Sequence, residues 1–351
     1  MDFDPRALGE AAPLIIAHYR RCGRMLPWRE SPTPYHVWIS EIMLQQTRIE
    51  AAIPYYHRFL AALPTVAALA AAEEEELLKL WQGLGYYTRA RNLKKAAEQV
   101  MAEFGGELPS DAALLRKLPG VGDYTAGAIA SIAYGRPEPA VDGNVLRVAM
   151  RLTGCEADVL QPQTKKAVTE ALRAVYPTGA DAGALTQGIM ELGETVCLPN
   201  GAPLCAVCPL ADLCEARRTG RAEQLPNRSE KKARRIENRT VFRLCCGETI
   251  ALRKRPARGL LANLWELPNE LGTLTEAEVR AKYPEAQSVE PLPEAKHIFT
   301  HVEWHMTGWQ VVLPALPPEF TPATQAELRE RYAVPNALRA YLPDRSDEGQ
   351  S

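Results

Sequence analysis

The chain has 351 residues, too many for one typical hydrophobic core, so we expect two domains. Its composition, 46% hydrophobic and 24% charged, is that of an ordinary globular protein, and its formal net charge of −2 confines any nucleic-acid surface to a local patch. No apolar run reaches transmembrane length and the acidic N-terminus lacks the order of a signal peptide, so we expect a cytoplasmic protein without a membrane partner.

The first part of the chain, residues 1–216, is predicted to be helical. Segments such as AAAEEEELLKLWQGL and NLKKAAEQVMAEF carry apolar residues at three- and four-residue spacing. Short Gly/Pro turns such as GGELPS and LPGVG separate them. The pattern therefore indicates a helical module built from repeated helix–turn–helix units.

Residues 217–239 differ from the helical part because they are strongly basic. They contain nine Lys or Arg residues against three Glu and few large apolar residues. Composition favours a solvated linker, and a linker that also touches phosphates is the alternative. From residue 240 to 344, short β-rich runs such as TVFRLCC and GWQVVLP predict an α+β domain, followed by a disordered tail at 345–351.

LPGVGDYTAGAIASIAYG is a helix–hairpin–helix signature. Gly120 and Gly122 permit a tight turn that leads into a helix near Asp123. The amides of the turn and the positive end of the helix would form an anion site suited to a DNA phosphate. Further along, the Asp-Gly-Asn run at Asp142 is typical of a turn or a helix N-cap, and on this segment alone such a structural role and a functional one are equally favoured.

Four of the eight cysteines lie within 18 residues, in CLPNGAPLCAVCPLADLC. Four thiolates this close favour a metal site over disulfides. Zinc and an iron–sulfur cluster both remain open on spacing alone. The single Cys-x2-Cys pair with longer arms on both sides favours a [4Fe–4S] cluster over zinc. The predicted ligands are Cys197, Cys205, Cys208 and Cys214.

Taken in this order, the motifs resemble the endonuclease III-like helix–hairpin–helix DNA glycosylases and, within them, the MutY family of adenine DNA glycosylases. The resemblance runs from LPWRE to HIFTH and includes WISEIMLQQTR, GLGYYTRARNL, VDGNVLRV and ELGETVC. It implies an all-α catalytic module with one [4Fe–4S] cluster, followed by a Nudix-like domain. Its predicted parts are a helical module at 1–216 (a six-helix region at about 30–136, a cluster region from 1–29 plus 137–216), a linker at 217–239 and the Nudix-like domain at 240–344.

The residue at the hairpin helix indicates the subclass. Endonuclease III-type enzymes that also cut the backbone carry a lysine where this chain has Tyr124, and tyrosine cannot form a Schiff base. The resemblance therefore implies a monofunctional glycosylase, although Tyr124 could also simply pack its helix.

The chemistry that follows parallels glycoside hydrolysis. Glu41 lies in the largely apolar HVWISEIMLQQT, where desolvation would raise its pKa; a solvated helix carboxylate is the alternative. The resemblance makes Glu41 the proton donor to N7 of adenine and Asp142 the carboxylate that stabilises, or transiently bonds to, the sugar C1′. Tyr124 and Asn144 would position Asp142 and the sugar.

The resemblance also assigns two groups of binding residues around a flipped base. Those predicted to line the adenine pocket are Arg24, Trp28, Arg29 and Gln187. Those predicted to contact the opposite base are Gln46, Thr47, Leu84, Tyr86, Phe299, Thr300 and His301.

The Nudix-like domain departs from the pattern of active Nudix hydrolases. The Glu-rich box that binds Mg²⁺ is absent after WELPNE, so we expect recognition without hydrolysis. The family reads 8-oxoguanine through a Phe-Ser-His loop, and here Thr300 replaces the serine but keeps the hydroxyl. The first cysteine gap has seven residues where the family pattern has six.

The leading hypothesis is a monomeric, cytoplasmic, nucleoid-associated enzyme of base excision repair. It would act on double-stranded DNA and remove adenine from A:8-oxoguanine or A:G pairs. The alternatives are a bifunctional endonuclease III-like lyase on oxidised pyrimidines, a non-catalytic DNA-binding protein with structural zinc, and a Nudix hydrolase with a helical appendage.

Overall fold

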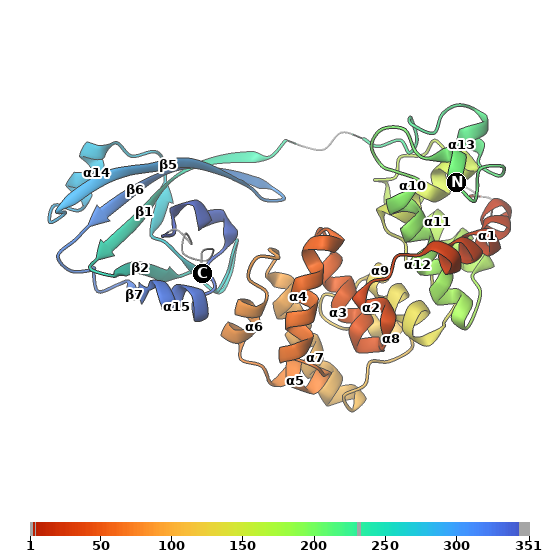
Figure 1. Cartoon of the computed structure of the whole chain (residues 1–351), viewed down its shortest axis with the longest axis horizontal. Helices are drawn as coiled ribbons and strands as arrows, with labels where there is room; N and C mark the ends of the chain where they lie inside the picture. Colours follow the sequence, from red (N-terminus) through yellow and green to blue (C-terminus); the bar gives the residue numbers. More distant parts are fainter. Residues whose placement is uncertain (1–2, 4, 230–232, 344–351) are drawn as a thin grey trace, which may run out of the picture. The chain divides into compact units, whose positions relative to one another are not determined.

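The computed structural model describes residue 3 and residues 5–229 and 233–343, and it divides the chain into two compact units (Figure 1). Unit 1 contains residues 1–71 and 92–230, and unit 2 contains residues 72–91 and 231–351. The predicted tail at 345–351 lies outside the described residues. None of the helices in the described part of the chain combines the length and apolar character that a membrane span requires.

Unit 1 is helical. Its elements are α1 (Arg6–Cys22), α2 (Pro27–Glu30), α3 (Pro34–Leu44), α4 (Ile49–Ala62), α5 (Val66–Ala71), most of α7 (Thr88–Phe104), α8 (Ala112–Leu115), α9 (Asp123–Ala128), the π-helical turn η1 (Ile129–Ala133), α10 (Gly143–Thr153), α11 (Pro162–Val175), α12 (Ala180–Thr195), the 3₁₀ turn η2 (Cys205–Val207) and α13 (Glu215–Arg218). The unit boundary falls inside α7, after Arg91.

Helix α3 is the apolar centre of one half of unit 1. Its N-cap is Thr33, whose hydroxyl accepts a hydrogen bond from the backbone N–H of His36. Most of its residues are buried, because it packs against α4, α9 and η1 at once. A helix that is apolar on nearly all sides is stable only in such a position.

The other half of unit 1 joins the two ends of the helical sequence. Helix α1 packs beside α10, α11 and α12, although more than a hundred residues separate it from them (Figure 1). Gly188 of α12 allows the close approach, because a Cβ there would stand 2.8 Å from Cγ2 of Ile15. The N-terminal helix therefore completes the core on which the later helices pack.

Unit 2 is an α+β fold around a mixed sheet. Its elements are α6 (Glu74–Leu80), β1 (Arg235–Cys246), β2 (Thr249–Lys254), β3 (Trp265–Glu266), β4 (Asn269–Leu271), α14 (Glu276–Lys282), β5 (Ser288–Ile298), β6 (Val302–Val312), β7 (Thr321–Thr324), α15 (Gln325–Glu330) and the 3₁₀ turn η3 (Asn336–Tyr341). The strand order is β3-β2-β1-β6-β5, with β4 beside β1 and β7 beside β2.

The sheet has a core on each face. The central strands β1 and β6 are parallel, and the other pairs are antiparallel. Because successive strand residues point to opposite faces, Val241 enters one core with Trp304 and Tyr341, and Phe242 enters the other with Val311. The predicted fold class, an all-α module followed by an α+β domain, is confirmed.

The segment 72–91 is a difference between the sequence pattern and the structure. The pattern places it in the helical module, whereas its contacts group it with unit 2. Polar side chains of the segment donate hydrogen bonds to main-chain oxygens of unit 2. Helical periodicity in the sequence therefore does not indicate that the segment packs on unit 2.

A test of the close packing in unit 1 is the substitution Gly127→Ala. A Cβ at Gly127 would stand 2.3 Å from the carbonyl oxygen of Pro139, so backbone must shift. We expect this variant to lose about 1–3 kcal/mol of stability, measured by thermal unfolding. Gly143→Ala is the matched control, because nothing lies within 4 Å of its new Cβ. Equal melting temperatures for the two variants would contradict the packing described here.

Candidate active site

Glu41 occupies the buried side of α3. Only 7% of the residue is exposed, and its Oε2 accepts a 2.6 Å hydrogen bond from the Tyr124 hydroxyl. The pKa of Glu41 is raised to about 7, because burial and, to a smaller extent, the negative charge of Asp142 raise it more than the hydrogen bond from Tyr124 lowers it. A carboxyl group with this pKa is partly protonated at neutral pH and can act as an acid.

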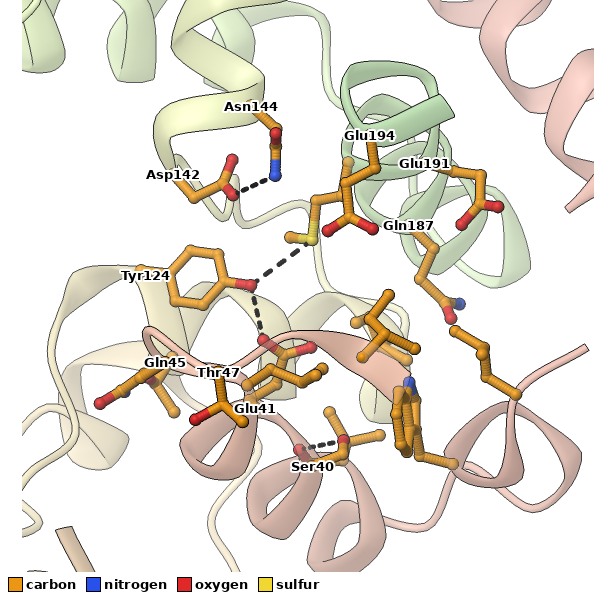
Figure 2. Close-up of a pocket in the computed structure, with 18 of the residues that line it drawn as sticks. Ser40, Glu41, Gln45, Thr47, Tyr124, Asp142, Asn144, Gln187, Glu191 and Glu194 are labelled. Atoms are coloured by element: carbon orange, nitrogen blue, oxygen red, sulfur yellow. Dashed lines mark hydrogen bonds between the residues drawn. The ribbon is translucent and has the colours of Figure 1, made fainter. Parts of the chain in front are cut away.

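Tyr124 stands on α9, directly after the hairpin turn. Its hydroxyl lies 2.6 Å from Glu41 Oε2 and 3.5 Å from the sulfur of Met190, and burial raises its pKa well above the ordinary value. In Figure 2 its side chain lies between Asp142 on one side and Glu41 on the other. The structure thus joins Tyr124 to Glu41 by a hydrogen bond, where the sequence analysis expected Tyr124 to position Asp142.

The two hairpin positions, Gly120 and Gly122, are under different steric constraints. Gly120 has a φ of +78°, and a Cβ there would stand 2.8 Å from Cβ of Asn92. Gly122 has a φ of −92° and open space around it, and it is the N-cap of α9. The tight turn therefore requires Gly120, whereas Gly122 leaves the turn's outer face without a side chain.

Asp142 is the N-cap of α10. Its Oδ1 accepts a 2.8 Å bond from the Val145 N–H, and its Oδ2 accepts a 2.9 Å bond from the Asn144 amide. Burial raises the pKa of Asp142, and these hydrogen bonds and the charge of Arg147 oppose the increase. The N-cap reading and the catalytic reading are thus compatible, since capping fixes the carboxylate in place.

Asn144 is itself held in place by a hydrogen bond from Arg147. Its carbonyl oxygen accepts a 2.8 Å bond from Arg147, whose guanidinium also donates to the Gly193 carbonyl at 2.7 Å. A Cβ at Gly193 would stand 2.6 Å from Cβ of Asn144, so only glycine lets α12 pass this close. The orientation of Asp142 therefore depends on packing between α10 and α12.

These groups line one cavity of about 930 Å³ in unit 1 (Figure 2). Glu41, Tyr124, Asp142 and Asn144 line it together, which brings all four predicted catalytic residues to one place. The volume is near the upper end of the range for small-ligand sites.

The predicted adenine-pocket residues also line this cavity. They are Arg24, Trp28, Arg29 and Gln187. Trp28 is buried and packs edge-on against Tyr56, with ring centroids 5.4 Å apart. Two of the predicted opposite-base residues, Gln46 and Thr47, line it as well.

Glu191, to which the sequence analysis gave no role, fixes two of these arginines. Its Oε1 accepts a 2.6 Å bond from Arg24 Nε, and its Oε2 accepts a 2.9 Å bond from Arg29 Nη2. Burial pulls the pKa of Glu191 upward, but the bonds and charges of the two arginines outweigh it and leave the pKa lowered. Glu191 is therefore ionised and braces one wall of the cavity.

Glu194 is a second unassigned carboxylate at this wall. It pairs with Arg24 Nη2 at 2.6 Å, and its charge contributes to the raised pKa of Glu41 and Tyr124. Both glutamates lie in ELGETVC, a motif that supports the resemblance but whose individual residues it left unassigned. The only sequence signal for them is the spacing of three residues, which places both on one face of α12.

The remaining opposite-base residues lie together in unit 2. Leu84, Tyr86, Phe299, Thr300 and His301 line a cavity of about 490 Å³ there, which we call the unit 2 cavity. The Thr300 hydroxyl lies 3.5 Å from the Tyr86 hydroxyl. Residues more than 200 positions apart in sequence therefore share one site.

The backbone around Tyr86 is unusual. Tyr86 has a φ of +47° and Gln46 in unit 1 has a φ of +60°, conformations that cost free energy for residues with a Cβ. Tyr86 is also 46% exposed, which is high for so large an aromatic side chain. Such strained and exposed residues are common where a chain contacts a ligand.

Two side chains just before Tyr86 in the chain hold this segment by donating hydrogen bonds to main-chain oxygens of residues 328–334. Lys79 donates to the carbonyl oxygens of Leu328 and Tyr332, at 3.0 and 3.2 Å. Gln82 donates to the Val334 carbonyl at 2.9 Å. These bonds fix the end of α6 and the start of the α6–α7 connection, just before Leu84 and Tyr86.

The four predicted cluster ligands follow α12. All are partly buried, and burial, with the nearby Cys197, Cys214 and Cys205, raises the pKa of Cys208 to about 11. Arg151 donates to Cys197 Sγ at 3.3 Å. Four thiols this near one another are the type of ligand that an iron–sulfur cluster requires. In the part of the chain that the structure describes, however, no group of His, Cys, Asp or Glu side chains has the geometry of a metal site.

Helix α14 occupies the place where an active Nudix domain has its Glu-rich box. Its glutamates Glu276 and Glu278 have other partners, because Glu276 pairs with Arg280 and Glu278 completes a capping box with Thr275.

Comparison with known proteins gives matches to both parts of the chain. The family described as HhH-GPD superfamily base excision DNA repair protein matches residues 39–177, and the NUDIX domain family matches residues 240–344. Among solved structures, a thermostable thymine-DNA glycosylase is 26% identical with a TM-score of 0.56, covering 61% of this chain and 98% of that one. An endonuclease III in complex with DNA is 25% identical with a TM-score of 0.52, covering 62% and 97%. These matches confirm the helix–hairpin–helix and Nudix-like assignments.

Curated relatives match over more of the chain. The adenine DNA glycosylase of Homo sapiens is 36% identical, over 82% of this chain and 64% of the human protein. The adenine DNA glycosylase of Mus musculus is 34% identical, over 88% of this chain and 72% of the mouse protein. On this similarity, the chain belongs to the adenine DNA glycosylase family.

Proposed function

We propose that this glycosylase hydrolyses the N-glycosidic bond of adenine paired with 8-oxoguanine or guanine in double-stranded DNA. The observation that carries the proposal is the cavity in which a buried acid, Glu41, and a hydrogen-bonded carboxylate, Asp142, stand on either side of Tyr124. Two carboxyl groups in contrasting environments are what an oxocarbenium-like reaction requires.

The steps follow from the residues in the cavity. The adenine leaves the stack and enters the cavity, where the protonated Glu41 donates a proton to N7. The glycosidic bond then breaks with its electrons moving to the base, and Asp142 stabilises the positive charge that develops at C1′. Asn144 holds Asp142 in place. A water molecule then bonds through its oxygen to C1′ and releases one proton to the solvent, which leaves an abasic sugar and free adenine.

The binding roles complete the proposal. Arg24, Arg29, Trp28 and Gln187 would contact the adenine. At the hairpin, Gly120 would permit the tight turn and Gly122 would leave room for a DNA phosphate. Gln46, Thr47, Leu84 and Tyr86 would contact the opposite base, and Phe299, Thr300 and His301 would read 8-oxoguanine.

Cys197, Cys205, Cys208 and Cys214 would hold a [4Fe–4S] cluster. When bound, it would tie together the segment after α12, and glycosidic hydrolysis itself transfers no electron. Arg151 would hold this segment through its bonds to Cys197 Sγ and to the Leu198 carbonyl oxygen at 2.8 Å. A cytoplasmic, monomeric protein remains our prediction.

The proposed reaction is tested by incubating the protein with A:8-oxoguanine, A:G and A:T duplexes and then adding alkali. We expect alkali-dependent breaks at the adenine of the first two. Glu41→Gln should slow the break at least about 100-fold, the usual contribution of general acid catalysis. Intact strands from A:8-oxoguanine after alkali would reject the proposed substrate, and a fully active Glu41→Gln protein would reject the proton donor.

The pH dependence of the excision step tests the link between Tyr124 and Glu41. Because Glu41 must be protonated, the single-turnover rate should fall as pH rises above about 7. The Tyr124 hydroxyl stabilises the charged carboxylate and so lowers this pKa. Tyr124→Phe should therefore move the falling limb to higher pH, whatever it does to the maximal rate. A limb that stays in place or moves to lower pH would contradict the link.

The hold on the Tyr86 segment is tested with Lys79→Met. Removing the ammonium leaves the Leu328 and Tyr332 carbonyls without this donor, so the segment should lose its fixed position. We expect the preference for 8-oxoguanine over guanine in single-turnover excision to fall about tenfold, as for the loss of one charged hydrogen bond. Lys282→Met, at an exposed ion pair of unit 2, is the matched control. An equal loss on both substrates would show that Lys79 serves stability alone.

A further inference from the structure

A second cavity of unit 2, of about 500 Å³, lies next to the unit 2 cavity and has no role in the chemistry above. We call it the arginine pocket. Its lining residues are Arg235, Glu237, Arg239, Arg255, Leu260, His301, Val302 and Trp304. The lining contains three guanidinium groups, those of Arg235, Arg239 and Arg255, and one carboxylate, that of Glu237. The charged side chains of the lining therefore carry a net charge of two positive units.

The first guanidinium, that of Arg239, is partly buried and held rigidly. Arg239 donates to Oδ1 of Asn269 at 2.8 Å and to Glu237 at 3.1 Å, and its guanidinium carbon lies 4.3 Å from the centroid of the Trp304 ring. Glu237 in turn accepts a 3.1 Å bond from the Trp304 indole. The charge of Arg239 is therefore fixed in orientation, which lowers the cost of ordering it around a ligand.

The second guanidinium, that of Arg255, is also partly buried and fixed by several contacts. Arg255 donates to the Leu260 carbonyl at 3.0 Å and pairs with Glu266, whose side chain is only 2% exposed. Arg253 pairs with the same carboxylate at 2.8 Å, so Glu266 cannot neutralise both cations. Arg253 and Glu266 add one positive and one negative charge to the count, so the excess around the pocket is still two positive charges.

The third guanidinium stands at the mouth of the pocket. The Arg235 side chain is 76% exposed and pairs with Glu237 at 2.5 Å. An exposed ion pair of this kind contributes little to stability, so Arg235 is available to a ligand at small cost. Planar guanidinium groups bind phosphate oxygens through two parallel hydrogen bonds.

The position of the pocket indicates which phosphate it would take. Leu260, His301 and Val302 line both the arginine pocket and the unit 2 cavity. His301 belongs to the loop proposed to read the opposite base, so a nucleotide with its base at that loop has its own phosphates within reach of the arginines.

We propose that the arginine pocket binds a phosphodiester of the DNA strand that carries 8-oxoguanine, beside the base read by the Phe299–His301 loop. The choice of strand rests on the proposed function. The pocket itself rests on the charges and contacts of unit 2. It would set the register of that loop on the strand, because phosphate contacts position a protein and base contacts specify.

The test is salt-dependent binding of the full-length protein. The probe is a duplex with 8-oxoguanine opposite 2′-fluoro-deoxyadenosine, an analogue that resists hydrolysis. Arg235→Gln should weaken binding severalfold and reduce the slope of log K against log salt by about 0.9, the value for one phosphate. Arg235→Lys should keep most of the slope, and Arg280→Gln, an exposed ion-paired arginine of α14, should leave it unchanged. A wild-type slope in Arg235→Gln would overturn the proposal.

Methylphosphonate linkages locate the contact, because they remove single phosphate charges. A neutral linkage beside 8-oxoguanine should abolish the effect of Arg235→Gln, whereas the same linkage in the adenine strand should not. The reverse pattern would overturn the strand assignment. If Arg235→Gln weakens binding of free dGMP alone and leaves the duplex unaffected, the pocket takes a free nucleotide and the DNA proposal fails.

The two proposals fail separately. The salt slope is measured also with guanine in place of 8-oxoguanine, where the change caused by Arg235→Gln should be the same. Intact strands from A:8-oxoguanine in the alkali assay would reject the proposed substrate and leave this slope change standing.

Discussion

The burial of one carboxyl group, that of Glu41, is the constraint on which the site depends. It is imposed by α3, an apolar helix packed against α4, α9 and η1 at once. The same packing that stabilises the helix removes water from the carboxyl group and raises its pKa to about 7. A carboxyl group that is still partly protonated near neutral pH, and so has a proton to donate to the base, is thus a consequence of the core. Tyr124 moderates the effect by donating one hydrogen bond.

The second carboxylate is controlled by the opposite means. Asp142 caps α10 and receives hydrogen bonds from Val145 and Asn144, which oppose the effect of burial on its pKa. Close packing of α10 against α12, permitted by Gly193, keeps Asn144 in position. Two carboxyl groups in one cavity therefore differ in role because one is desolvated and the other is hydrogen-bonded.

The sequence was sufficient to predict the helical and α+β parts and the gathering of Glu41, Tyr124, Asp142 and Asn144, because motif order and apolar periodicity carry that information. It did not predict that Tyr124 binds Glu41, nor the role of Glu191 between two arginines, because such contacts depend on three-dimensional packing. The grouping of residues 72–91 with unit 2 was also missed, since side-chain bonds to main-chain oxygens leave no trace in a residue pattern.

The most direct test of this account is the pKa of Glu41 in the full-length protein without DNA. Glutamate labelled with ¹³C at the side-chain carboxyl is followed by NMR through a pH titration, and the Glu41 signal is assigned by its loss in Glu41→Gln. The account predicts a midpoint at about 7, well above the ordinary 4.5. A midpoint at the ordinary value would show that the carboxyl group is solvated and would contradict the assignment of Glu41 as the acid.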